Sequence, residues 1–166
     1  CSSDLKGIAS GMPLGALIAR EHIMNWDAGA HGSTYAGNPV ACAAALATLD
    51  LIENGYMQNA AEQGAFLLDA LEEMRAKHPT MRHARIDGKG LMVGVELVLD
   101  EARTPAKQVL QATERHGINN GVLLLGAGKS SVRFCPPLMI ERDTLVAGLR
   151  RFDQSLTQAE QDLGLL

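Results

Sequence analysis

Several sequence patterns are missing from this chain of 166 residues, and each absence narrows its possible functions. The basic residues form no stripe, and the net charge is −4 with both signs interspersed, which argues against nucleic acid as a partner. No apolar run approaches the roughly 20 residues that a membrane-spanning helix needs, so we expect no membrane partner. The five histidines show no His-x-x-x-His spacing and the cysteines no Cys-x-x-Cys spacing, so no metal site is indicated.

Cysteine is also scarce. The three cysteines, Cys1, Cys42 and Cys135, are far apart and odd in number. This pattern favours reduced thiols over a disulfide framework. No signal-peptide pattern is visible, and we therefore expect a cytoplasmic protein.

The chain does contain enough apolar residues for a folded core. Hydrophobic residues make up 46% of the sequence, which is too many for a disordered chain. Its length suits one domain, or one domain and a piece of another. The first residue is Cys1 rather than methionine, and a Gly-rich lysine motif follows almost at once. We therefore expect the chain to be the C-terminal part of a longer polypeptide.

The lysine motif occupies residues 4–16, which read DLKGIASGMPLGA. Its glycines allow the backbone to turn tightly and a ligand to come close. A partly desolvated lysine at this place would have its free amine favoured, and a free amine can form a Schiff base with a carbonyl cofactor. The alternative is a surface lysine beside a Gly-rich turn.

A second motif follows at residues 31–42, which read HGSTYAGNPVAC. Together with residues 6–15, KGIASGMPLG, it resembles the class III (fold-type I) aminotransferases that use pyridoxal phosphate. The two segments occur in that family in this order and at about this spacing. The residues of the first segment are most similar to those of the 4-aminobutyrate and acetylornithine branch. The family usually has a small residue where this chain has Leu5. Its members are two to three times as long as this chain.

The resemblance implies a fold, a cofactor and a set of site residues. The fold class is α/β with an α+β small domain, as in the C-terminal portion of a fold-type I transferase that depends on pyridoxal 5'-phosphate. Lys6 would form the Schiff base and later move the Cα proton. Thr34, beside Ser33, would bind the cofactor phosphate in the active site of the neighbouring subunit, which makes a homodimer part of the mechanism. Arg133 would bind the substrate carboxylate.

From chemistry alone, these residues have simpler interpretations. Ser33 and Thr34 could belong to an ordinary polar loop. Arg133 lies between apolar residues in the segment SVRFCPPL, and a buried arginine there would need a structural carboxylate partner. Residues 126–131, GAGKSS, superficially resemble a phosphate-binding loop but lack its first glycine and a following helix.

Periodicity predicts the elements. The apolar run 14–19 is either a buried strand or a helix. Asn38 and Pro39 predict the start of a buried helix over residues 40–52 that ends at Asn54 and Gly55. Further elements follow to the C-terminus: a helix over 58–78, strands over 83–87 and 91–99, a helix from Thr104 to His116 closed by Gly117, strands over 122–125 and 131–135, and a helix over 142–163.

These elements predict two domains. Residues 1–55 would be the remnant of the large cofactor-binding domain, and residues 56–166 a C-terminal small domain with the order β-β-α-β-β-α. The aspartate that the family places beside the pyridinium nitrogen, in an Asp-Glu-x-Gln motif, is not among these residues. The family's main phosphate loop is missing as well, so we expect this chain to be inactive alone.

The predicted function is transfer of an amino group from an amino acid or ω-amino acid, such as 4-aminobutyrate, to a 2-oxo acid. The partners would be the small-molecule amino donor and the 2-oxo acid acceptor. A racemase or epimerase of the same family is the first alternative, because it would use the same lysine and cofactor. The second alternative is a truncated chain that only folds or dimerises, without catalysis.

Overall fold

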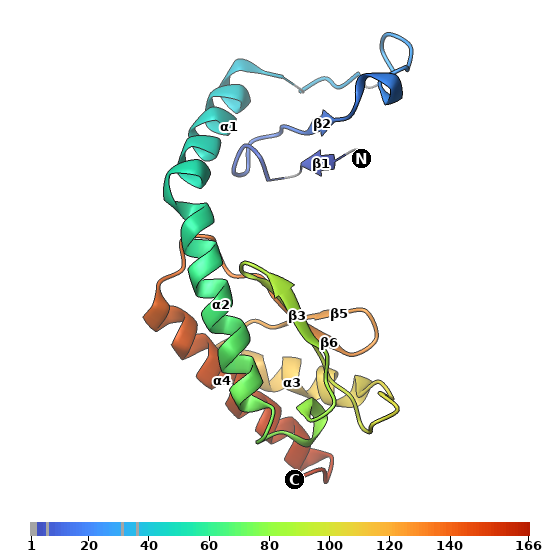
Figure 1. The fold of residues 1–166 in the computed structure, drawn as a ribbon, viewed down its shortest axis with the longest axis vertical. Coiled ribbons are helices and arrows are strands. Elements are labelled where there is room, and N and C mark those ends of the chain that lie inside the picture. Colours follow the sequence, from blue (N-terminus) through green and yellow to red (C-terminus); the bar gives the residue numbers. More distant parts are fainter. Residues whose placement is uncertain (1–2, 6, 31, 36) are drawn as a thin grey trace. The chain divides into compact units, whose positions relative to one another are not determined.

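The computed structural model describes residues 3–5, 7–30, 32–35 and 37–166 (Figure 1). The chain divides into two compact units, Cys1–Tyr56 and Met57–Leu166. Among the described residues, no helix is both long and apolar enough to cross a membrane. Because the placement of the two units relative to each other is not determined, each is described by itself.

The first unit begins with a small antiparallel pair of strands, β1 (Ser3–Leu5) and β2 (Ala16–Ile18). β2 lies in the apolar run 14–19, for which the sequence allowed either a strand or a helix, and the structure has a strand there. The expectation of burial is wrong, because the side chain of Ile18 is 65% exposed. A short 3-10 helix, η1 (Glu21–Ile23), follows the strand.

Helix α1 (Pro39–Leu51) starts where the sequence predicts. The side chain of Asn38 accepts a hydrogen bond of 2.9 Å from the backbone N–H of Ala41, and Pro39 takes the first helical position. The prediction of a buried helix is wrong for this chain: of the α1 residues only Ala41 and Ala45 are buried, and Leu46 is 69% exposed. Two three-residue strands and a 3-10 turn offer too little apolar surface to cover a helix all round within this unit.

The helix ends close to where the sequence predicts, because α1 stops at Leu51 and the helical backbone is interrupted at Asn54 and Gly55. The backbone continues through a π-helical segment, η2 (Ile52–Tyr56), into α2 (Met57–Met74). Asn54 and Gly55 have non-helical backbone angles inside that segment. α2 is shorter than predicted, since it ends at Met74 and not at His78. A 3-10 helix, η3 (Pro79–Met81), follows it.

The second unit contains a four-stranded antiparallel sheet. Its strands are β3 (Ile86–Lys89), β4 (Met92–Glu96), β5 (Leu125–Ala127) and β6 (Ser131–Phe134), in the order β3-β4-β6-β5. The α+β order predicted from the sequence is confirmed, although strand bounds move by several residues. Residues 126–131, the GAGKSS segment, form the hairpin between β5 and β6, with no helix after it.

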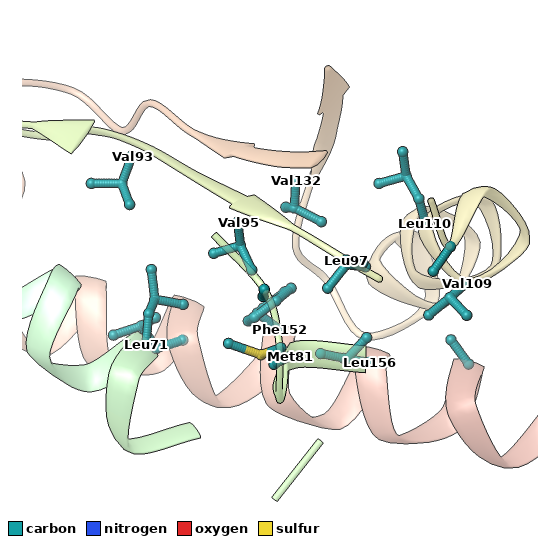
Figure 2. Packing of buried hydrophobic residues seen from close by; sticks show 14 of the residues in the cluster. Leu71, Met81, Val93, Val95, Leu97, Val109, Leu110, Val132, Phe152 and Leu156 are labelled. Atoms are coloured by element: carbon teal, nitrogen blue, oxygen red, sulfur yellow. The ribbon is translucent and has the colours of Figure 1, made fainter. Parts of the chain in front are cut away.

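Helices pack on one face of this sheet, namely α2, α3 (Lys107–Asn119) and α4 (Arg142–Asp162) (Figure 1). Figure 2 shows Val95 and Val132 of the sheet lying over Phe152 and Leu156 of α4, and all four are buried. The sequence of this helix has an apolar stripe that predicts a packed face, and its members are buried up to Ala159: Leu145, Leu149, Phe152, Leu156 and Ala159. Its last member, Leu163, follows the end of the helix and is exposed.

Helix α3 does not end at Gly117, as the sequence suggested. Gly117 lies inside the helix and is buried. A side chain would not fit here, since a Cβ would lie 2.9 Å from the backbone oxygen of Val122. The helix ends at Asn119, and Gly121 follows with a positive φ of 76°. Gly117 thus allows close packing of the helix against the following segment, and the turn after the helix is at Gly121.

Candidate functional site

The lysine motif forms consecutive tight turns in the structure, although Lys6 itself lies outside the described residues. The backbone N–H of Ser10 donates to the oxygen of Gly7 at 3.1 Å, and that of Met12 donates to Ala9 at 3.1 Å. Ser10 and Gly11 both have positive φ. The Ser10 hydroxyl lies 2.9 Å from the Thr48 hydroxyl, which ties this turn to α1.

Ser33 and Thr34 lie in the loop that leads into α1, and both are exposed. Within the described part of the chain, neither hydroxyl has a hydrogen-bond partner. The end of the loop is fixed, because the side chain of Asn38 donates to the oxygen of Tyr35 at 2.9 Å while it caps α1. Two exposed hydroxyls are suitable donors for phosphate oxygens, so they fit part of a pyridoxal phosphate site.

Arg133 lies in β6 between Gly94 of β4 and Leu125 of β5. The expectation of a buried, paired arginine is wrong, because the residue is exposed and has no ion pair with any residue that the structure describes. The alternation of the strand explains this difference: Val132 points into the core, so Arg133 points to the face away from the helices. Its guanidinium is consequently available to a ligand.

Two hollows lie close to this strand. Arg133 borders an apolar cavity of about 540 Å³, whose other lining includes Leu123, Leu125, Phe134 and Ile140. Its sheet neighbour Gly94 borders an open hollow of about 560 Å³ on the polar face. Because α4 residues such as Leu145 and Leu149 line this cavity, it lies on the helix side of the strand, whereas the guanidinium of Arg133 faces the polar side.

The polar hollow carries its own ion pair. Arg85 donates to Asp87 at 2.6 Å, and this hydrogen bond, aided by the backbone N–H of Gly88, lowers the pKa of Asp87. Glu96 and Lys89 complete the charged lining. The open face of the sheet is therefore polar around Arg133, which distinguishes it from the apolar face that covers the core.

One cluster of ionisable residues was missed in the sequence analysis. His78 lies between Glu160 and Asp153, which are 82 and 75 residues away in the chain. No local spacing reports such a contact, and the only available signal was that two acids lie seven residues apart on one predicted helix. Within the described ranges, no group of three or more His, Cys, Asp or Glu side chains is placed to hold a metal ion.

Comparison with known proteins places these residues in context. A sequence model described as aminotransferase class-III matches residues 1–156. An acetylornithine aminotransferase of Caldanaerobacter subterraneus subsp. tengcongensis is 34% identical over 154 residues, which cover 92% of this chain and 37% of that protein. An isoleucine 2-epimerase of Lentilactobacillus buchneri is 38% identical, with 93% and 35% covered.

Solved structures agree with the sequence comparison. An amine transaminase from an uncultivated Pseudomonas species, described as PLP-bound in its internal aldimine form, superposes with a TM-score of 0.71 and 32% identity. The match covers 78% of this chain and 30% of that protein. The expected fold, a portion of such a transferase, is confirmed. The chain spans about a third of the length of the curated relatives that it matches.

Proposed function

Because the chain belongs to the class III aminotransferase family, whose cofactor is pyridoxal phosphate, we propose that it acts as part of a longer aminotransferase. The reaction would move an amino group from an amino acid or ω-amino acid to a 2-oxo acid. The family match over residues 1–156 carries this proposal, since it includes both the lysine motif and the Thr34 loop. Acetylornithine and 4-aminobutyrate are the donors that we propose to test first.

Each site residue then has a specific role. When bound, pyridoxal phosphate supplies an electron sink for the bonds at the substrate Cα. Lys6 would hold the cofactor covalently and move the proton at that Cα. Ser33 and Thr34 would donate hydrogen bonds to phosphate oxygens, and Arg133 would bind the carboxylate of the donor through its planar fork.

Lys6 can play this role only in a site that removes it from water. An ordinary lysine amine has a pKa of about 10.4, so it is protonated and poorly nucleophilic at pH 7. Burial disfavours the charged form and frees the amine. We propose that residues 1–55 are the remnant of the large domain that provides this environment together with the rest of the enzyme.

We also propose that the enzyme is a homodimer. In this arrangement Thr34 serves the phosphate in the neighbouring subunit's site, by analogy with the family. The exposure of the Ser33 and Thr34 hydroxyls supports this proposal, because a loop whose ligand belongs to another subunit must face outwards from its own chain.

A second function is supported by one specific observation, which is the 38% identity to an isoleucine 2-epimerase. An epimerase would use Lys6 for proton transfer at Cα without net transfer of the amino group. We rank this function after aminotransfer.

A substrate panel separates the two. The longer protein, loaded with pyridoxal phosphate, would be incubated with 2-oxoglutarate and, in turn, acetylornithine, 4-aminobutyrate or L-isoleucine. We expect glutamate to form from at least one of the first two donors, at a rate that depends on the 2-oxo acid. Inversion of L-isoleucine without any 2-oxo acid would support the epimerase instead. The absence of both reactions would favour a folding or dimerisation module.

Replacement of Arg133 by alanine tests its role in substrate binding. A charge-assisted hydrogen bond to a carboxylate contributes about 1.5–3 kcal/mol, so we expect KM for the donor to rise roughly 10- to 100-fold while kcat changes less. The spectrum of the bound cofactor should stay unchanged. Steady-state kinetics over a range of donor concentrations measures both constants.

Two further variants sharpen this test. Arg133→Lys keeps the charge but loses the fork, and we expect an intermediate KM. Arg115→Ala removes an exposed arginine from α3, on the other side of the sheet, and should leave KM at its normal value. An unchanged KM in Arg133→Ala would leave this residue without a part in substrate binding.

A further inference from the structure

A histidine in the second unit is buried between two carboxylates. His78 follows α2 and is only 2% exposed. Its Nδ1 lies 2.7 Å from Oε2 of Glu160, and its Nε2 lies 2.8 Å from Oδ1 of Asp153. Both acids belong to α4, so a single ring connects the segment between α2 and β3 to the last helix of the chain.

Glu160 is completely buried, and both of its carboxylate oxygens take part in hydrogen bonds. Its second oxygen, Oε1, accepts hydrogen bonds from the hydroxyl of Thr80 at 2.6 Å and from the backbone N–H of Thr80 at 3.1 Å. A carboxylate in such a place needs a positive partner, because an unpaired buried charge is strongly destabilising. The ring of His78 is the cationic group within reach.

The remaining charges around the ring belong to two helices and the segment between α2 and β3. Lys77 lies 3.6 Å from the Oδ2 oxygen of Asp153, so this acid is shared between the ring and an exposed ammonium. Glu73 of α2 and Arg150 of α4 line the same surface pocket as Lys77 and Asp153. Of these four residues, Asp153 contacts the ring of His78. The second partner of the ring is the buried Glu160.

The two short contacts determine the protonation state of the ring. A neutral imidazole has one N–H donor and one lone pair, so it could donate to one carboxylate only. Its lone pair would then face the oxygen of the other carboxylate at less than 3 Å, which is repulsive. When both carboxylates are ionised, it is the doubly protonated ring that satisfies Glu160 and Asp153 together.

We propose that His78 is held as an imidazolium that clasps α4 to the segment after α2, and that loss of its ring proton releases the C-terminal turns of α4. We call His78, Asp153, Glu160 and Thr80 the α4 clasp. It would make this unit less stable at alkaline pH. The proposal concerns folding alone and does not depend on the aminotransferase reaction.

The electrostatics agree with the geometry in sign. Burial by itself lowers the pKa of His78, but the hydrogen bonds and charges of Glu160 and Asp153 outweigh it and raise the pKa above the ordinary 6.5. A group whose pKa is raised by folding stabilises the folded state fully below its unfolded pKa. That stabilisation is lost as the pH rises through the folded-state pKa.

The clasp can be tested on the 166-residue chain. We would record ¹⁵N shifts of the histidine rings, and hydrogen exchange corrected for its intrinsic pH dependence, from pH 6 upwards. We expect both ring nitrogens of His78 to carry protons at pH 7. We also expect amides of residues 153–162 to lose protection in step with the deprotonation of this ring.

A matched control is a histidine of α3 that contacts the same helix, α4. His116 contacts Asp162 of α4 at 2.8 Å, but this pair is partly exposed and not enclosed by a second acid. We expect His116→Gln to keep the normal pH dependence of stability, whereas His78→Gln should be less stable at pH 6 and lose its alkaline transition. A His78 ring that titrates at or below 6.5 would overturn the proposal. If His78→Gln does not fold, the titration of the unmodified chain still decides the question.

Discussion

Replacement of Gly64 by alanine is expected to destabilise the second unit by at least about 2 kcal/mol. Gly64 lies in α2, where the helix backbone packs directly against the turn between β3 and β4. A Cβ at this position would overlap the carbonyl group of Gly90 and lie 2.7 Å from its Cα. All of these atoms are backbone, so no flexible side chain can move aside.

The turn has little freedom to yield. Gly90 has a φ of 55°, and the pair Lys89–Met92 fixes the end of the hairpin next to it. A Cβ on Gly90 would itself lie 3.4 Å from the backbone oxygen of Ala60, so the two chain segments meet through glycines on both sides. Relief would therefore require the hairpin to shift away from α2, which opens the contact with the core.

Thermal unfolding of the 166-residue chain, followed by circular dichroism, measures the effect. For a unit of this size, about 2 kcal/mol corresponds to a fall in Tm of roughly 8 °C. Gly148→Ala is the matched control, because Gly148 is also helical but has nothing within 4 Å of its would-be Cβ. That substitution should raise Tm slightly, since alanine favours a helix over glycine. A Gly64→Ala protein with unchanged Tm would mean that helix and turn are not in close contact.

Local signals in the sequence predicted the second unit well. The stripe from Leu145 to Ala159 marked the buried face of α4, and Asn38 with Pro39 marked the start of α1 in the first unit. Such signals depend on nearest neighbours along the chain, so they survive in any tertiary context. The order of the elements after residue 56 was predictable for the same reason.

Predictions that depended on distant contacts did less well. The apolar composition of α1 suggested burial, but the described residues of the first unit leave side chains such as Leu46 exposed. Gly117 resembled a helix end, and only the approach of Val122 shows why a glycine stands there. His78 and Glu160 meet across 82 residues, a contact that no spacing rule can predict.

The candidate site shows the same division. Its residues were identified by resemblance to a family, and their chemistry by residue type. The resemblance predicted a ligand-binding Arg133, whereas its apolar sequence neighbours alone suggested a buried ion pair; strand alternation places the residue on the exposed face of the sheet. The environments of Lys6 and of the cofactor are still predictions, and they are best tested by experiment.

Replacement of Lys6 by alanine in the longer enzyme is expected to lower the rate of amino transfer by roughly 10²- to 10⁴-fold, the usual contribution of a positioned proton-transfer group. The variant loses both the covalent hold on the cofactor and the base that moves the Cα proton. We therefore also expect the visible absorbance band of the protein-bound cofactor to disappear, and the cofactor to be lost more readily on desalting. Absorbance before and after desalting measures the hold independently of activity.

Two further variants distinguish the amine chemistry of Lys6 from its charge and from phosphate binding by Thr34, and a third variant is a control. Lys6→Arg keeps a positive charge but no free amine, so it should be as inactive as Lys6→Ala. Thr34→Ala should keep the absorbance band and lose cofactor faster, because it removes one hydrogen bond to the phosphate. Lys129→Ala, in the exposed β5–β6 hairpin, should behave as the unmodified enzyme. If Lys6→Ala kept both the band and the turnover, another amine would have to hold the cofactor, and residues 4–16 would be only a Gly-rich turn.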